Sequence, residues 1–123
     1  MGGNVSAEGD VYSYGILLLE MFSGHRPTGS SLAMDHAINL HDYVKHALPH
    51  NVMEIADPRI VLQPEDRGSP KDEAVRIELC LASIFEVGIL CSLEMPRERV
   101  DISVAIKHLN VARDKLLQSG FKL

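Results

Sequence analysis

The stretch GDVYSYGILLLEM, residues 9–21, decides the fold of this 123-residue chain. Its apolar residues surround most of a helical circumference, which is typical of a helix that is packed on all sides. We expect this helix to run from about Val11 to Ser23, with Asp10 as its N-cap, because a carboxylate there accepts backbone N–H groups of the next turn. Gly24 suits the left-handed position that ends such a helix.

The segments that follow read as one loop and one short helix. Residues 28–37 are rich in Gly, Ser and other small residues, which predicts a mobile surface loop. Hydroxyls at its start could accept phosphate, but no recognition motif surrounds them, so a plain linker is the default interpretation. Apolar residues at spacings of three and four then predict a short amphipathic helix that Pro49 ends: Leu40, Tyr43, Val44 and Ala47. From His50 to Ser69 we expect at most a helical turn, around Val52 to Ala56.

Two long amphipathic helices complete the pattern. The first begins at Ser69 and Pro70 and stops before Pro96, with a predicted buried stripe of Ile77, Leu81, Ile84, Gly88 and Cys91. The second runs from Asp101 to about Gln118, with a predicted stripe of Ile102, Ala105, Leu109, Ala112 and Leu116. No strand alternation competes with these helices, so the pattern alone predicts an all-α fold of four helices with long irregular connections.

Composition excludes several classes of function. A chain of 123 residues with a formal net charge of -5 suffices for one domain and carries no basic stripe, so nucleic acid is not an expected partner. The longest apolar stretch, Tyr12 to Phe22, is too short for a membrane span and contains Glu20. No Gly-x-Ser-x-Gly element occurs that would indicate a hydrolase.

Cysteine and histidine spacings do not predict a bridge or a metal centre. Cys80 and Cys91 are eleven residues apart in one helical pattern, about 16 Å along the axis, so we expect free thiols in a reducing compartment. His46 and His50 stand four apart, but Pro49 between them breaks the helical geometry that zinc ligation would need. Exposed, solvated histidines are the preferred interpretation.

Several ordered motifs resemble plant receptor-like serine/threonine kinases, particularly the leucine-rich-repeat class. The first motif is residues 5–28, which include the central helix. The others are Asn39 to Val44, Glu54 to Pro58 and Cys91 to Val100, and together the motifs extend over essentially the whole chain. The resemblance implies that residues 1–123 are a partial protein kinase domain, the C-terminal part of the large lobe. Such a piece has the central buried helix and later helices of that lobe, without the β-rich N-terminal lobe.

Four residues of the first helix match family positions. The resemblance implies that an aspartate at Asp10 holds the backbone of the catalytic loop, and that Leu17 and Met21 support the apolar column below the adenine ring. For Leu17 and Met21, ordinary core packing is the simpler interpretation. Glu20 matches an acidic position near the peptide-substrate groove, and the alternative is a carboxylate paired with an arginine, because an ionised group in so apolar a helix needs a partner.

Arg99 is the more diagnostic family position. The resemblance implies that an arginine here pairs with a glutamate at the end of the activation segment, and that glutamate would lie upstream of Met1. We therefore expect Arg99 to have lost its ion-pair partner. If it stays buried it must find another carboxylate, because an unpaired buried charge costs several kcal/mol, and otherwise it turns to solvent.

The sequence lacks the machinery of phosphoryl transfer. That reaction requires a Gly-rich phosphate loop, a strand lysine, a catalytic aspartate in a His-Arg-Asp context and a metal-holding aspartate in Asp-Phe-Gly, and none of these motifs is present. We therefore predict no catalytic, cofactor-binding or metal-binding residue in this chain. The resemblance implies ATP and magnesium for the full-length kinases, which phosphorylate Ser or Thr in signalling, but inactivity for this chain alone.

The absent upstream segments should also leave part of the first helix open. An exposed apolar face marks a partner site or an aggregation hazard, so protein partners are expected there. The alternative function is accordingly a stand-alone helical interaction module, derived from a kinase, that binds kinase partners. The resemblance implies a cytoplasmic location, at the cytoplasmic side of the plasma membrane for the parent family.

Overall fold

A computed structural model describes residues 7–25, 33–61 and 70–118, and these residues form helices and no strand. The helices are α1 (Ala7–Ser23), α2 (Ala33–Ala47), α3 (Val52–Ile55), α4 (Pro58–Val61), α5 (Pro70–Cys91), the 3-10 helix η2 (Pro96–Glu98) and α6 (Ile102–Gln118). The predicted all-α class is confirmed for the described residues. None of their helices is long and apolar enough to cross a lipid bilayer.

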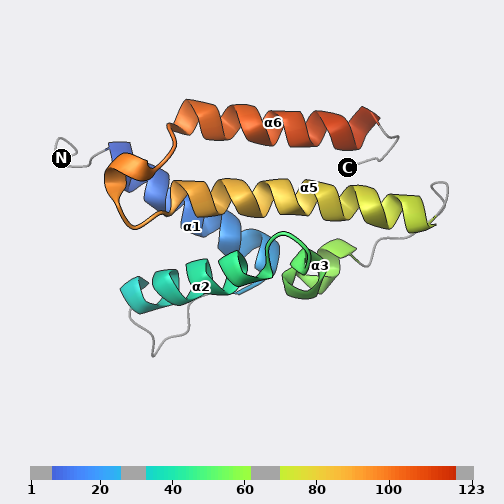
Figure 1. Cartoon of the computed structure of the whole chain (residues 1–123), viewed down its shortest axis with the longest axis horizontal. Coiled ribbons are helices and arrows are strands. Elements are labelled where there is room, and N and C mark those ends of the chain that lie inside the picture. Colours follow the sequence, from blue (N-terminus) through green and yellow to red (C-terminus); the bar gives the residue numbers. More distant parts are fainter. Residues whose placement is uncertain (1–6, 26–32, 62–69, 119–123) are drawn as a thin grey trace.

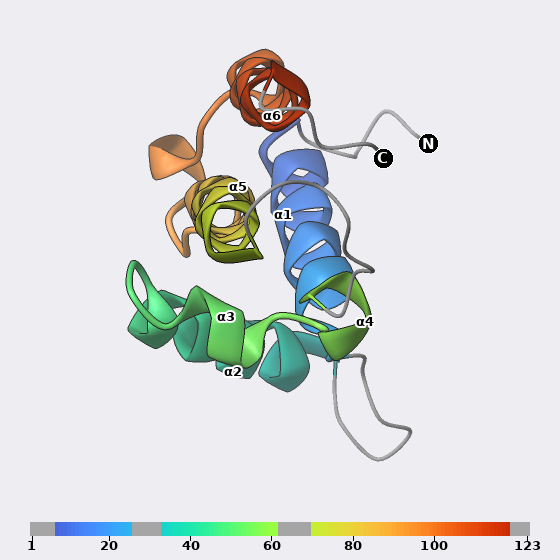
Figure 2. The ribbon, with the colours of Figure 1, turned by 90° about the vertical axis from the view of Figure 1, so that its right-hand side faces the viewer.

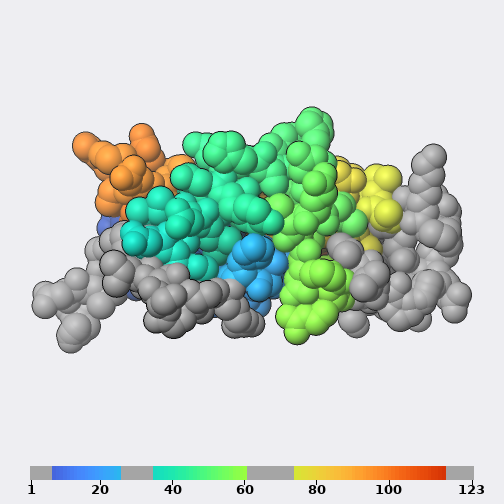
Figure 3. Space-filling view, turned by 90° about the horizontal axis from the view of Figure 1, so that it is seen from below, coloured from blue at the N-terminus to red at the C-terminus, as the bar shows by residue number. Residues whose placement is uncertain are grey.

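The helices lie in three tiers around α1. In Figure 1, α5 and α6 run side by side in opposite directions, and α1 passes behind α5. Turned by 90°, α6 lies above, α5 and α1 occupy the middle, and α2, α3 and α4 lie beneath them (Figure 2). Seen from below, α2, α3 and α4 cover most of the described surface, and part of α1 reaches it between them (Figure 3). Helix α1 is thus the structural centre of the described residues.

The lower core joins α1 to α2, α3 and α5. Its most deeply buried side chains are Leu19, Val44, Val52 and Phe85, each with no exposed surface. Each comes from a different helix, so the cluster ties four segments of the chain together. Burial of a large apolar side chain contributes about 1.5 to 3 kcal/mol, and these four residues therefore account for much of the stability of this tier.

The upper core joins α1 to α5 and α6. It contains Val11, Leu18, Val87, Cys91 and Ala105, with Leu109 packed against it. The predicted stripe of α5 is largely confirmed, because four of its five residues are buried: Ile77, Leu81, Gly88 and Cys91. In the predicted stripe of α6, Ala105 and Ala112 are buried. Ile84 is only half-buried, and the prediction that Ile102 lies in the core was wrong, since it is 39% exposed. The prediction for the Leu116 side chain lies outside the described residues.

Two glycines let α1 and α5 approach each other closely. A Cβ atom on Gly15 would lie 2.7 Å from the Cβ of Cys91 and 2.7 Å from the backbone oxygen of Gly88. On Gly88 it would lie 2.5 Å from Cδ2 of Leu19. Real Cβ atoms do not tolerate such distances, and a backbone oxygen cannot rotate away as a side chain can. Gly15 therefore requires glycine for packing, whereas a Cβ at Gly88 would displace the Leu19 side chain.

Two predicted helix starts were wrong. Helix α1 begins at Ala7, so Asp10 lies inside its first turn and is not the N-cap. The physical reason is that Ala7 and Glu8 favour helix and carry it one turn further, while an acidic residue in the first turn still suits the helix dipole. Helix α2 begins at Ala33, inside the predicted loop of residues 28–37, because alanine is the best helix former and Ala37 is buried. Residues 28–32 lie outside the described residues.

The irregular stretch after α2 agrees better with the sequence pattern. The helical turn expected around Val52 to Ala56 is confirmed as α3, and α2 ends at Ala47, before Pro49. Helix α4 was missed, since four residues that begin with a proline give no periodicity to detect. Helix α5 begins at Pro70 as predicted, and α6 spans nearly the predicted range.

The close approach of α1 and α5 yields a prediction. Gly15→Ala should lower the free energy of unfolding by about 2 kcal/mol, because an added methyl group overpacks a contact with backbone. Urea denaturation measures this change. Ser13→Ala, at an exposed position of the same helix, is the matched control and should change stability by less than about 0.5 kcal/mol. Equal stability of the two variants would contradict the packing argument.

Candidate functional site around the first helix

Arg99 connects the start of α1 to the turn that follows α5. Its guanidinium donates three hydrogen bonds to backbone carbonyls: Nε to Leu93 at 2.6 Å, Nη1 to Glu8 at 2.9 Å and Nη2 to Glu94 at 3.1 Å. The guanidinium carbon also lies 4.6 Å from the centre of the Tyr12 ring, within cation–π distance. One side chain thus fixes three chain segments relative to one another.

The prediction that Arg99 would either pair with another carboxylate or turn to solvent was therefore wrong. Within the described part of the chain it forms no ion pair with a carboxylate, and it does not turn to solvent. Carbonyl oxygens carry partial negative charge and an aromatic face is attractive to cations, so a neutral environment can satisfy a half-buried guanidinium. Tyr12 belongs to the motif that decides the fold, but nothing in the sequence indicated this contact.

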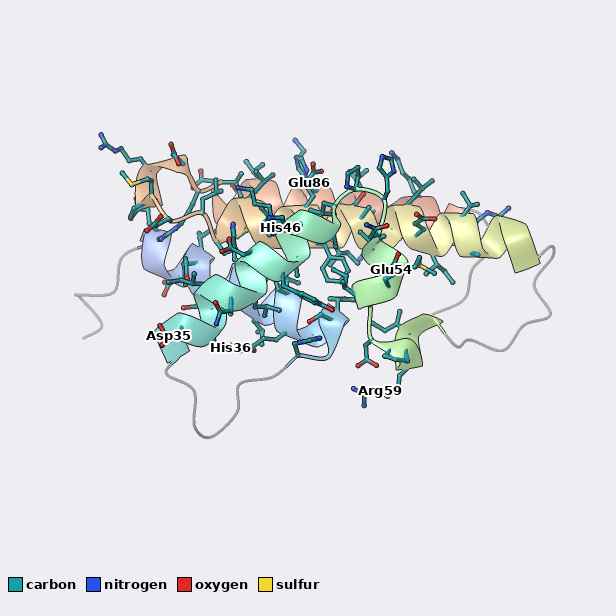
Figure 4. The ribbon with its side chains drawn as sticks, turned by 60° about the horizontal axis from the view of Figure 1, so that its bottom comes forward. Asp35, His36, His46, Glu54, Arg59 and Glu86 are labelled. Atoms are coloured by element: carbon teal, nitrogen blue, oxygen red, sulfur yellow. The ribbon has the colours of Figure 1, made fainter. Side chains whose placement is uncertain are left out.

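Glu20 joins α1 to α2 through a histidine. Its Oε2 accepts a hydrogen bond from Nε2 of His36 at 2.9 Å, and the two side chains are only 16% and 14% exposed. The prediction that Glu20 needs a partner is confirmed, but that partner is a histidine instead of an arginine. His36 lies near the N-terminal end of α2 (Figure 4), sixteen residues away along the chain, which no short-range pattern could reveal.

Gly24 and Asp57 fix the C-terminal end of α1. Gly24 has a φ of 76°, which confirms the predicted left-handed end of the helix, and its N–H donates to the carbonyl of Glu20 at 2.9 Å. A Cβ at Gly24 would lie 3.0 Å from Oδ2 of Asp57. The buried Asp57 in turn accepts hydrogen bonds from the backbone and guanidinium of Arg59, which extends into solvent (Figure 4). Asp57 belongs to one of the sequence motifs, but the motif did not predict this role.

His41 joins α2 to the end of α5. The Ser92 hydroxyl donates to the carbonyl of Gly88 at 2.7 Å, so its oxygen accepts the 2.8 Å bond from Nδ1 of His41. This order assigns the proton of the neutral ring to Nδ1. Burial lowers the pKa of His41 below its ordinary value of 6.5, Asp42 opposes that shift, and Lys45 adds to it.

Three of the predicted family positions share an exposed face of α1. Asp10, Leu17 and Met21 recur at spacings of seven and four, and Ser13 lies between them; we call these four residues the open face of α1. Leu17 and Met21 are 48% and 49% exposed, so the interpretation of ordinary core packing was wrong for both. Asp10 is also exposed, and its side chain makes no hydrogen bond with the part of the chain described here. The expectation that this side of the helix is open is confirmed.

The remaining candidate groups are structural. Cys80 is half-buried and Cys91 is buried, both are free thiols, and burial raises the pKa of each, which disfavours the reactive thiolate. His46 and His50 are exposed as predicted, and Nδ1 of His46 donates to the carbonyl of Asp42. Among the described residues, no group of three potential ligands could hold a metal ion.

Comparisons with known proteins give relatives over nearly the whole chain. The chain is 39% identical over 120 residues to a probable LRR receptor-like serine/threonine-protein kinase of Arabidopsis thaliana, 98% of this chain and 11% of the relative. It is 40% identical over 119 residues to the LRR receptor-like serine/threonine-protein kinase EFR of the same plant, 97% of this chain and 10% of the relative. No protein-family model matches it.

A third relative comes from another plant. The chain is 33% identical over 118 residues to the receptor kinase-like protein Xa21 of Oryza sativa subsp. japonica, 94% of this chain and 11% of the relative. The chain thus spans about a tenth of the length of the curated relatives that it matches.

The Arg99 contacts yield a prediction for stability. Arg99→Ala should lower the free energy of unfolding by about 2 kcal/mol, because hydrogen bonds from a charged donor are lost together with the contact to Tyr12. Chemical denaturation measures the change. Arg97→Ala, at an exposed arginine two residues away, serves as the control and should fall within about 0.5 kcal/mol of the unsubstituted chain. A loss of the same size in both variants would refute the assignment.

The pKa of His41 yields a prediction for pH dependence. Since its folded pKa lies below the unfolded value, the unfolded chain binds more protons near pH 6.5, and stability falls as pH drops through that region. His41→Asn, whose amide can still donate to Ser92, should make stability less dependent on pH between about 7 and 5. Denaturation at a series of pH values gives the slopes. An unchanged slope in His41→Asn would count against the burial of His41.

Proposed function

This chain is homologous, over nearly its whole length, to a segment of the plant leucine-rich-repeat receptor-like serine/threonine protein kinases, and we propose that it serves as the C-terminal part of the large lobe of such a kinase domain. In that role it supplies helical scaffold and substrate-side surface for transfer of the ATP γ-phosphoryl group to protein Ser or Thr hydroxyls. The homology carries this proposal, because it includes 94 to 98% of the chain in three relatives.

The arrangement of the helices supports the proposal. α1 carries the motif of the central kinase helix, and the other long helices, α2, α5 and α6, surround it. Polar contacts hold both of its ends, because Arg99 donates to the carbonyl of Glu8 and the N–H of Asp57 donates to the carbonyl of Phe22. A helix fixed in this way is suited to present its open face to the segments that carry catalytic residues in the parent family.

By itself the chain is proposed to be inactive. Phosphoryl transfer depends on positioned phosphates, magnesium and a catalytic aspartate, and the 123 residues contain none of the motifs that supply them. ATP and magnesium are therefore proposed as cofactors of the full-length relatives, and not of this chain alone. We place its action in the cytoplasm, at the cytoplasmic side of the plasma membrane, by analogy with that family.

One observation favours a second function, that of a stand-alone module that binds kinase partners. Leu17 and Met21 expose apolar surface on the open face of α1, where a partner could bind without any catalysis by this chain. The two proposals differ in what precedes Met1 in the genome. An upstream reading frame that encodes His-Arg-Asp and Asp-Phe-Gly supports the kinase segment, and an untranslated leader supports the module.

Nucleotide binding tests the proposed inactivity. Magnesium–ATP at millimolar concentration should leave the melting temperature of the purified chain unchanged, because a ligand stabilises only a protein that binds it. Differential scanning fluorimetry measures this temperature. The same titration on a protein that continues upstream through the His-Arg-Asp and Asp-Phe-Gly segments of a relative is the positive control, with a rise of several degrees.

Two outcomes would refute the inactivity. The first is a dose-dependent rise in the melting temperature of the chain alone with ATP. The second is transfer of radioactive phosphate to a Ser- or Thr-containing peptide by a preparation free of other kinases.

A further inference from the structure

A shallow groove of about 280 Å³ runs between α5 and α6, on a side of the molecule that the family positions do not use. Ser83 and Glu86 of α5 line it together with four residues of α6: His108, Val111, Ala112 and Lys115. Figure 4 shows Glu86 on the side of α5 that faces away from α1. The groove is therefore separate from the open face of α1. We call it the α5–α6 groove.

Exposed apolar side chains lie in and beside the α5–α6 groove. Val111 lines it and is 48% exposed, while Leu79 and Val75 continue the same face of α5 and are 65% and 49% exposed. Val104 lies two turns before Val111 on α6 and is also exposed. Several exposed apolar residues on neighbouring helix faces, next to polar groups, are typical of a surface that binds another protein.

The charges of the groove lie toward its opposite ends. Helices α5 and α6 run antiparallel, and Ala105 packs in one cluster with Val87 and Cys91, so higher numbers on α6 lie beside lower numbers on α5. This register places Glu86 toward one end and Lys115 toward the other. Ser83 and Ala112 lie between them: Ala112 is buried at the base of the groove, and Ser83 is exposed and small enough to let another helix approach closely.

This arrangement of one negative and one positive charge is complementary to the same arrangement in a second copy of the chain. If a second copy is turned by a two-fold axis that lies in the plane of the groove and is perpendicular to the line from Glu86 to Lys115, its Lys115 faces Glu86 of the first copy, and its Glu86 faces Lys115. Neither Glu86 nor Lys115 forms an ion pair within the described part of the chain, so both are available for this purpose. A two-fold interface needs such self-complementarity, because the same surface patch of both copies meets in it.

We propose that the α5–α6 groove binds a second copy of this chain in a two-fold symmetric dimer, in which Glu86 of each copy pairs with Lys115 of the other. Apolar contacts of Leu79 and Val111 supply the affinity, because exposed ion pairs contribute little by themselves. The two charge pairs fix the register and exclude parallel pairing, which would place like charges together. This inference does not depend on the proposed function.

Charge reversal tests the dimer on the full chain. Sedimentation velocity of the unsubstituted chain should show a mass that rises with concentration from 13.6 kDa toward twice that value. Glu86→Lys alone and Lys115→Glu alone should each weaken self-association by about tenfold or more, since like charges then face each other across the axis. An equimolar mixture of the two variants should associate again, because the two groove lysines of one variant then face the two groove glutamates of the other.

Controls separate this contact from a general effect of charge. Glu54→Lys and Lys107→Glu change exposed residues outside the groove by the same charge, and both should associate like the unsubstituted chain. Circular dichroism of each variant checks that it is folded. The proposal is overturned if the unsubstituted chain stays monomeric, if the single groove variants associate as strongly as it does, or if their mixture fails to recover association.

Discussion

The close contact between α1 and α5 is the constraint on which the remaining structure depends. Gly15 and Gly88 bring the two backbones so near that a single methyl group would collide with one of them. This distance fixes how deeply Leu19 enters the lower core and where Cys91 lies in the upper core. Because α5 then contacts α2, α3 and α6, the crossing of two helices sets the position of nearly every other helix described.

Polar contacts at three points add to the packing that holds α1 in place. Arg99 donates to the carbonyl of Glu8 at the start of the helix, Glu20 binds His36 near its end, and the N–H of Asp57 donates to the carbonyl of Phe22. A helix clamped at three points can expose Leu17 and Met21 without losing its position, since its opposite side carries the packing. The homology to receptor-like kinases offers an explanation for this exposed side of α1, because in our proposal further segments of the kinase domain cover it.

The sequence predicted helices better than it predicted contacts. Periodicity located the buried stripes of α5 and α6, and turn chemistry located Gly24, because each depends on neighbours within a few residues. Composition misled at residues 33–37, where small residues indicated a loop although alanine favours helix. The contacts of Arg99 with Glu8 and of Glu20 with His36 could not be predicted, since they join residues 91 and 16 positions apart and depend on how the tiers are stacked. Core packing was the wrong interpretation for Leu17 and Met21, because an all-round apolar helix need not be covered on every side.

The way in which Arg99 is bound has a consequence for variation among related sequences. Its three acceptors are main-chain oxygens of Glu8, Leu93 and Glu94, and every amino acid provides such an oxygen whatever its side chain. Substitution at any of these three positions therefore leaves the acceptor in place, and no acceptor can be titrated away by acid. Only Arg99 itself and the ring of Tyr12 need to keep their chemical identity. This junction can thus persist while its surroundings diverge.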